Sequence, residues 1–122
     1  MEEIWKDIEG YEGLYQVSNL GRVKSAPRRG TKGGLLKNSK NTGGYYFVGL
    51  YKDNILNRVL VHRIVYETFV GLIPDSLEIN HINENKADNR LENLNLMTPK
   101  ENCNWGTRNN RIKLNRKLKD AG

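Results

Sequence analysis

The sequence of 122 residues contains a single cysteine and no long apolar run. One cysteine excludes an internal disulfide and any zinc knuckle built from cysteine pairs. No segment approaches the roughly 18 consecutive apolar residues of a membrane-spanning helix. The chain begins with the acidic stretch Met1-Glu2-Glu3, which is unlike a secretory signal. We therefore expect an intracellular protein with no membrane segment.

Apolar residues are also scarce overall. They make up 37% of the chain, and the mean hydropathy is −0.72, which is lean for a well-buried core. A chain of this length is expected to form one compact domain, or a small domain with a module attached. We expect an elongated protein with long polar loops.

Acidic residues are missing from one segment and nearly missing from another. Residues 22–40 hold seven basic side chains and no acid, and residues 103–122 hold six basic side chains and one acid. The middle of the chain, residues 41–102, is nearly neutral, with six bases and eight acids. Either basic segment alone is explained by a solvated loop, but two of them around a neutral centre favour a polyanionic partner.

The first half of the chain predicts small β elements. Residues 14–18 and 22–25 alternate apolar and polar side chains around the turn residues 19–21, which predicts two short strands. Residues 26–44 read as a basic, glycine-rich loop. This loop lacks the Gly-Lys-Ser/Thr ending of a nucleotide-binding P-loop, so we exclude nucleotide binding there.

A second hairpin and a helix follow. Residues 45–51 and 58–61 predict two strands joined by a polar turn. Apolar residues at helical spacing then predict a helix over residues 62–70, which Gly71 ends.

The most informative stretch runs from Glu78 to Asn104. It holds Asn80-His81 after an apolar residue typical of a strand, then Asn93 in Leu-Glu-Asn-Leu, and then Asn102. Just before Asn102, the segment Thr98-Pro99-Lys100-Glu101 predicts a helix start with a capping box. The stretch therefore predicts a β-hairpin followed by a helix packed across it.

These residues resemble the HNH nucleases, whose ββα-metal (His-Me finger) unit cuts phosphodiester bonds. Residues 4–25 resemble a separate module that often precedes such units in phage and intron-encoded homing endonucleases. The resemblance implies an α+β fold: small antiparallel β modules plus a ββα-metal unit with short helices. It also implies a β DNA-binding module with a basic loop over residues 1–44, a nuclease domain over 45–106 and a basic tail over 107–122.

The resemblance implies a role for each polar residue of this stretch. His81 corresponds to the general base, because a neutral imidazole can take a proton from water at neutral pH. Asn93 corresponds to the residue that orients this ring. Asn80 and Asn102 correspond to the ligands of one Mg²⁺ or Mn²⁺ ion. The family usually has an aspartate among these ligands, so two neutral amides predict weak metal binding until DNA supplies phosphate oxygens.

The expected partner is double-stranded DNA, held by basic side chains outside the site. The residues expected to contact it are Arg22, Lys24, Arg28, Arg29, Lys32, Arg108 and Arg111. We expect a monomer that nicks one strand; cutting both strands would need a dimer or two visits. The expected location is the cytoplasm of a bacterial or phage-infected cell.

Other readings of the sequence remain open at this stage. One is an HNH protein that has lost cleavage and only binds DNA, and another is an RNA-binding or RNA-processing role. A zinc site formed by Cys103, His62 and His81 lacks the close ligand spacing of structural zinc. Asn89 is expected to serve in a turn or cap, and His62 to make a hydrogen bond beneath the site.

Overall fold

The computed structural model describes residues 2–27 and 32–103, which form three small antiparallel sheets with short helices between and after them. This is the mixed α+β architecture that the sequence predicted. The first sheet contains β1 (Trp5–Asp7), β2 (Tyr15–Ser18), β3 (Val23–Ser25) and β4 (Gly34–Leu35). The second contains β5 (Ser39–Lys40), β6 (Tyr46–Lys52) and β7 (Ile55–Leu60), and the third pairs β8 (Glu78–His81) with β9 (Leu94–Met97).

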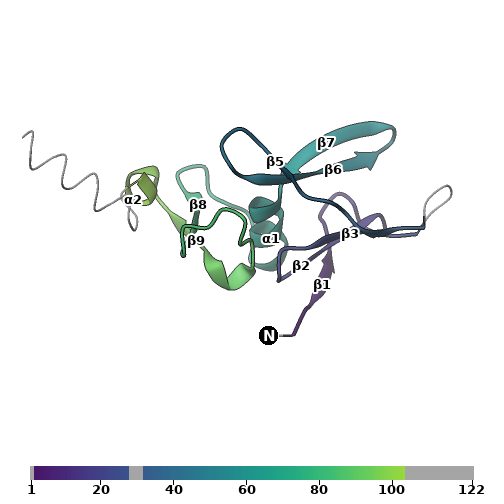
Figure 1. The fold of residues 1–122 in the computed structure, drawn as a ribbon, viewed down its shortest axis with the longest axis horizontal. Helices are drawn as coiled ribbons and strands as arrows, with labels where there is room; N and C mark the ends of the chain where they lie inside the picture. The colour runs from purple at the N-terminus through teal and green to yellow at the C-terminus, as the bar shows by residue number, and fades with distance from the viewer. Residues whose placement is uncertain (1, 28–31, 104–122) are drawn as a thin grey trace, which may run out of the picture.

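Helix α1 (Val61–Phe69) lies at the centre of the molecule, between the N-terminal sheet and the β8–β9 hairpin (Figure 1). Val61 and Val65 on this helix are fully buried. They belong to one apolar cluster with residues of the first and second sheets, including Val17, Val23 and Leu50. The helix therefore packs the first and second sheets around a shared core.

No helix within the described ranges is long and apolar enough to cross a membrane.

The predicted hairpin and helix are confirmed, with small shifts in their ends. The turn between β6 and β7 is tighter than expected, because Asp53 and Asn54 both adopt positive φ angles, of 52° and 64°. Such a two-residue turn matches the twist of the flanking strands and lengthens both of them. Helix α1 begins at Val61 and ends before Gly71, whose φ of 147° departs from helical geometry.

Two strands of the first sheet were not predicted. Strand β1 pairs with β2, and β4 pairs with β3 from within the segment that the sequence predicted to be a loop. These strands have three and two residues, too few for an alternating pattern to be visible. Strand β5 lies in the same predicted loop and has two residues.

The β8–β9 hairpin and the helix that follows it confirm the ββα prediction. After a short 3₁₀ turn, η1 (Leu91–Asn93), strand β9 leads directly into α2 (Pro99–Cys103). The backbone N–H of Thr98 donates to Glu101 Oε1 at 3.0 Å, and the N–H of Glu101 donates to Thr98 Oγ1 at 3.2 Å. This reciprocal capping box sets the start of the helix that carries Asn102.

Candidate active site

His81 ends strand β8 and is almost completely buried. Its Nε2 lies 2.8 Å from Asn89 Oδ1. The imidazole of His62 packs edge-on against the His81 ring, with 5.1 Å between ring centroids, and the ring of Tyr45 lies 6.1 Å away. The histidine is thus enclosed by the start of α1, the segment before β6 and the loop after β8.

The residue that holds the His81 ring is Asn89, where the sequence predicted Asn93. Asn93 uses its amide within the loop: its Nδ2 donates to Asn83 Oδ1 and to the backbone oxygen of Asp88, both at 2.9 Å. Its Oδ1 accepts the backbone N–H of Asn83 at 3.0 Å. Asn93 therefore shapes the loop that carries Asn89. The sequence predicted a turn or cap role for Asn89, whereas its side chain contacts His81.

The contact with Asn89 selects one form of the His81 ring. An amide oxygen can only accept a hydrogen bond, so His81 Nε2 must carry the proton. In the neutral imidazole the basic lone pair then lies on Nδ1. In its neutral form, an imidazole buried and held in this orientation is suited to general-base chemistry.

Asn80 precedes His81 and is 1% exposed, which makes it one of the most buried polar residues described. Its Nδ2 donates to Asn95 Oδ1 across the hairpin at 3.1 Å. Its Oδ1 is buried and has no hydrogen-bond partner among the described residues. A buried, unpartnered amide oxygen costs free energy, and a cation ligand is one role that explains such a group.

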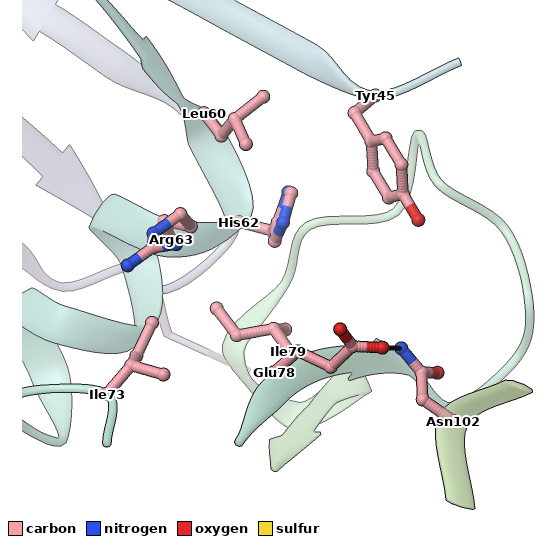
Figure 2. A pocket seen from close by; sticks show the side chains of 8 residues that line it. All are labelled: Tyr45, Leu60, His62, Arg63, Ile73, Glu78, Ile79 and Asn102. Atoms are coloured by element: carbon pink, nitrogen blue, oxygen red, sulfur yellow. Dashed lines mark hydrogen bonds between the residues drawn. The ribbon is translucent and has the colours of Figure 1, made fainter. Parts of the chain in front are cut away.

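Asn102 is held in place by a carboxylate. Its Nδ2 donates to Glu78 Oε1 at 2.7 Å, so α2 and the start of β8 are joined beside the site (Figure 2). With Nδ2 directed at Glu78, the amide oxygen of Asn102 faces away from that carboxylate. Asn102 is buried and Glu78 is exposed.

Glu78 and Asn102 line a pocket of about 160 Å³. Figure 2 shows the hydroxyl of Tyr45 and the ring of His62 directed into the same space. The remaining lining residues are Leu60, Arg63, Ile73 and Ile79. The pocket therefore adjoins the rings packed on His81 and brings Asn102 into the same region as the histidine.

Glu78 was missed as a site residue, and it changes the expected electrostatics. The sequence predicted two neutral amides with no charge, whereas the structure has a carboxylate hydrogen-bonded to one of them. A signal existed: side chains two positions apart on a strand share a face, so Glu78 is on the Asn80 face of β8. Carboxylate partners of this kind orient metal ligands and raise their basicity.

His62 is the second buried histidine of this region. Burial, with smaller contributions from the charges of His81 and Arg63, lowers the pKa of His62 to about 4. The ring is therefore neutral at pH 7. Its Nδ1 has no hydrogen-bond partner among the residues described, so the expected hydrogen bond beneath the site is not formed there; the ring instead packs between Tyr45 and His81.

Two of the basic residues predicted to contact DNA share one face of the first sheet. The guanidinium carbon of Arg22 lies 5.8 Å from the centre of the Trp5 ring, and the ammonium of Lys24 lies 4.2 Å from it. Arg22 is also paired with Glu3. Lys32 is exposed, while Arg28, Arg29, Arg108 and Arg111 lie outside the described residues.

The zinc alternative has no support in the described ranges. Cys103 is exposed, and no group of three or more histidine, cysteine, aspartate or glutamate side chains gathers there in a metal-binding arrangement. The oxygen donors of Asn80 and Asn102 instead suit a hard cation such as Mg²⁺ or Mn²⁺.

Comparison with known families assigns both parts of the chain. Residues 3–51 match the NUMOD4 motif, and residues 59–103 match the HNH endonuclease family. The second match contains every residue predicted for catalysis and metal binding, together with Glu78 and Asn89. The first covers the N-terminal sheet, so the resemblance of residues 4–25 to a nuclease-associated module is confirmed.

Individual relatives agree with this assignment. The chain is 40% identical over 98 residues to DNA endonuclease I-HmuI of Bacillus phage SP01, an alignment covering 80% of this chain and 54% of that protein. It is 39% identical over 120 residues to the uncharacterized HNH endonuclease L247 of Acanthamoeba polyphaga mimivirus, covering 94% of this chain and 29% of the relative. The chain thus spans about half or less of the length of these relatives.

A solved structure of the HNH homing endonuclease I-HmuI, described as showing DNA binding and cleavage, superposes on this fold. The TM-score is 0.68 and the sequence identity is 33%. The superposition covers 99% of this chain and 60% of the other. The agreement extends over both the N-terminal sheet and the ββα unit. The chain therefore carries a NUMOD4 motif followed by an HNH endonuclease domain, and both parts are similar to the HNH homing endonuclease I-HmuI.

Proposed function

We propose that this protein is a metal-dependent endonuclease that hydrolyses phosphodiester bonds in double-stranded DNA. The observation that carries the proposal is the buried His81 imidazole, oriented by Asn89, in a ββα unit that also carries Asn80 and Asn102. His81 would accept a proton from a water molecule at Nδ1 as that water attacks the phosphorus. Asn89 holds the opposite side of the ring.

The residues present fit a divalent cation. Asn80 and Asn102 would hold it through their amide oxygens. The Oδ1 of Asn80, which is buried and has no partner within the described part of the chain, supports this assignment. A bound Mg²⁺ or Mn²⁺ would stabilise charge on the phosphoryl group and on the departing 3′-oxygen. Glu78 keeps Asn102 in one orientation and adds negative charge close to the ligands.

We further propose that metal and DNA bind cooperatively. Glu78 adds charge beside Asn102 but is hydrogen-bonded to it and is not itself a proposed ligand. Two amide ligands alone would give the protein little affinity for a strongly hydrated ion, so phosphate oxygens of the bound DNA would complete the coordination. Tight, stoichiometric Mg²⁺ binding by the DNA-free protein would contradict this.

We propose that DNA is held outside the site by the Trp5 face of the first sheet, with Lys24 and Arg22, and by the two basic segments of the chain. Phosphate contacts of this kind are independent of sequence and weaken with salt. Because residues 2–27 and 32–103 form one such site, a monomer would nick one strand.

The direct test is incubation of supercoiled plasmid with the purified protein and Mg²⁺ or Mn²⁺. Nicked circles that form with wild type and metal, and disappear with EDTA or with His81→Ala, would support the enzyme. Gel retardation without cleavage by the wild-type protein would instead support a DNA-binding protein that has lost activity.

A further inference from the structure

The buried contact between Asn89 and His81 depends on a segment far away in the sequence. Asn89 is 4% exposed, and it lies at the end of the loop between β8 and η1. Its side chain meets the His81 ring on one side. Its backbone meets the turn between β2 and β3 of the N-terminal sheet on the other.

The approach of that turn is close enough to require glycine. A Cβ built on Gly21 would lie 2.9 Å from both the carbonyl carbon and the carbonyl oxygen of Asn89, and 3.1 Å from its Cβ. Real side chains do not tolerate such distances to backbone atoms. Two residues further along, the N–H of Leu91 donates to the backbone oxygen of Asn19 at 2.7 Å. The turn therefore contacts the chain on both sides of residue 90.

The turn itself is held firmly in shape. Ser18 Oγ accepts the backbone N–H groups of Leu20 and Arg22, both at 3.2 Å. The side chain of Asn19 accepts the N–H of Ile4 at 2.7 Å and donates to the backbone oxygen of Glu2 at 3.1 Å. Gly21 has a φ of +86°, which a residue with a side chain rarely adopts.

The loop that carries Asn89 also makes hydrogen bonds of its own. Asn83 Nδ2 donates to Asp88 Oδ2 at 2.7 Å, and the N–H of Ala87 donates to Asn85 Oδ1 at 3.0 Å. These bonds set the shape of the loop tip. Closer to Asn89, Asn93 Nδ2 donates to the backbone oxygen of Asp88 at 2.9 Å, so Asn93 supports the residue before Asn89 and the turn supports Asn89 itself.

We infer that Asn89 is the positioning residue for His81, and that the Asn19–Gly21 turn of the NUMOD4 motif holds Asn89 against the ring. The N-terminal motif then has a second task besides DNA contact: it completes the support of the general base. This inference rests on the proposed function for its effect on cleavage, but its structural part concerns the DNA-free and metal-free protein.

The proton on His81 Nε2 provides a readout that does not need activity. When donated to a buried acceptor, this N–H exchanges slowly with water and gives a separate signal in proton–nitrogen NMR spectra. We expect that signal in the full wild-type chain with EDTA present. It should be lost by exchange broadening in Asn89→Ala and retained in Asn89→Asp, which keeps an acceptor oxygen at the same position.

Gly21→Ala tests the role of the turn, and Gly10→Ala is its matched control. Both glycines have a φ of +86°, so alanine introduces the same backbone strain, but a Cβ at Gly10 meets nothing within 4 Å. We expect Gly21→Ala to weaken or remove the His81 N–H signal and Gly10→Ala to preserve it. If Gly21→Ala does not fold, Asn19→Ala loosens the same turn without adding atoms and is expected to weaken the signal.

Cleavage assays give the second reading. Displacement of a catalytic group by about 1 Å can reduce the rate roughly 100-fold. We expect Asn89→Ala and Gly21→Ala to lower kcat 10- to 100-fold by this principle, while DNA affinity in EDTA stays within about twofold of the Gly10→Ala protein. The inference is overturned if Asn89→Ala keeps the slow N–H signal, or if Gly21→Ala matches Gly10→Ala in both signal and kcat. A wild-type protein that shows the signal but never cleaves would refute the proposed function alone.

Discussion

The carboxylate of Glu78 accepts a hydrogen bond from the amide of Asn102 at 2.7 Å. This bond links the first residue of β8 to helix α2. An amide has one donor end and one acceptor end, so this bond fixes the orientation of the Asn102 side chain. It also brings negative charge close to Asn102, one of the two neutral amides proposed to hold the cation.

Replacement of Glu78 by glutamine should therefore weaken metal binding. Loss of an outer partner of a metal ligand typically reduces metal affinity 10- to 100-fold. We expect a reduction of roughly that size in Glu78→Gln. The measurement is electron paramagnetic resonance of Mn²⁺ bound to the protein–DNA complex. The Glu78→Gln protein and the protein with Glu78 both also carry His81→Ala, so that the DNA is not cleaved.

Glu12→Gln is the control, since it removes an exposed carboxylate that accepts the backbone N–H of Gly10. It should leave Mn²⁺ affinity unchanged. Equal affinities in the Glu78 and Glu12 variants would show that Glu78 has no part in the metal site.

The cap of α2 should matter for the site more than for the fold. Thr98→Ala removes the side-chain acceptor of the capping box and should cost about 1 kcal/mol, the usual value for an N-cap. Because α2 has five residues and carries Asn102, the loss should appear as weaker Mn²⁺ binding and slower cleavage. Thr98→Ser, which retains the acceptor, should behave as wild type in both assays.

His62 should make the fold sensitive to acid. Its pKa is about 4 in the folded protein, against 6.5 for an ordinary histidine, so the unfolded chain binds more protons between these values. Stability should consequently fall as the pH is lowered through 6.5 and stop falling, for this group, below about 4. Between pH 7.5 and 5 the contribution of His62 amounts to about 2 kcal/mol.

Urea unfolding at several pH values measures this effect. The variant His62→Phe keeps an aromatic ring against Tyr45 and cannot be protonated, so its stability should vary less with pH by about that amount. The comparison uses the change in unfolding free energy with pH, because the absolute stabilities of the two proteins also differ through packing. Parallel curves for the two proteins would contradict the assignment of a low pKa to His62.

Lys24 and Arg22, the two cations beside the Trp5 ring, should contribute unequally to DNA affinity. Lys24→Ala removes a cation that lies over the ring, and should weaken DNA binding and reduce the salt dependence by about one phosphate contact. Arg22 is already neutralised in part by Glu3, so Glu3→Gln is expected to strengthen DNA binding. Both effects are measured by fluorescence anisotropy in EDTA over a range of salt concentrations. Weaker binding by Glu3→Gln would mean that the ion pair supports the DNA-binding face.

Local patterns were sufficient to predict the ββα unit. The capping box at Thr98 and Glu101 depends on side chains three residues apart, and the hairpin strands alternate visibly. Helix α1 was predicted within one residue, because its apolar positions recur at helical spacing. These features depend on neighbours in the sequence, so the sequence contains the information for them.

The partner of His81 could not be predicted in this way. The stretch is rich in asparagines, and six of them lie within 15 residues of His81: Asn80, Asn83, Asn85, Asn89, Asn93 and Asn95. The choice depends on the path of the loop, which turns at Glu84 with a φ of 64° and is contacted at Asn89 by Gly21. That contact joins positions 68 residues apart, so local spacing contains no signal for it. Glu78, by contrast, was detectable from strand alternation with Asn80.

The central claim is that one divalent cation is held by Asn80 and Asn102 beside His81. It is tested most directly by a crystal structure of the His81→Ala protein bound to duplex DNA and Mn²⁺, with the ion located by its anomalous scattering. The account predicts one Mn²⁺ peak within coordination distance of the Oδ1 atoms of Asn80 and Asn102 and of a DNA phosphate oxygen. A peak held by other residues, or DNA bound in the site with no Mn²⁺ beside these two asparagines, would contradict it.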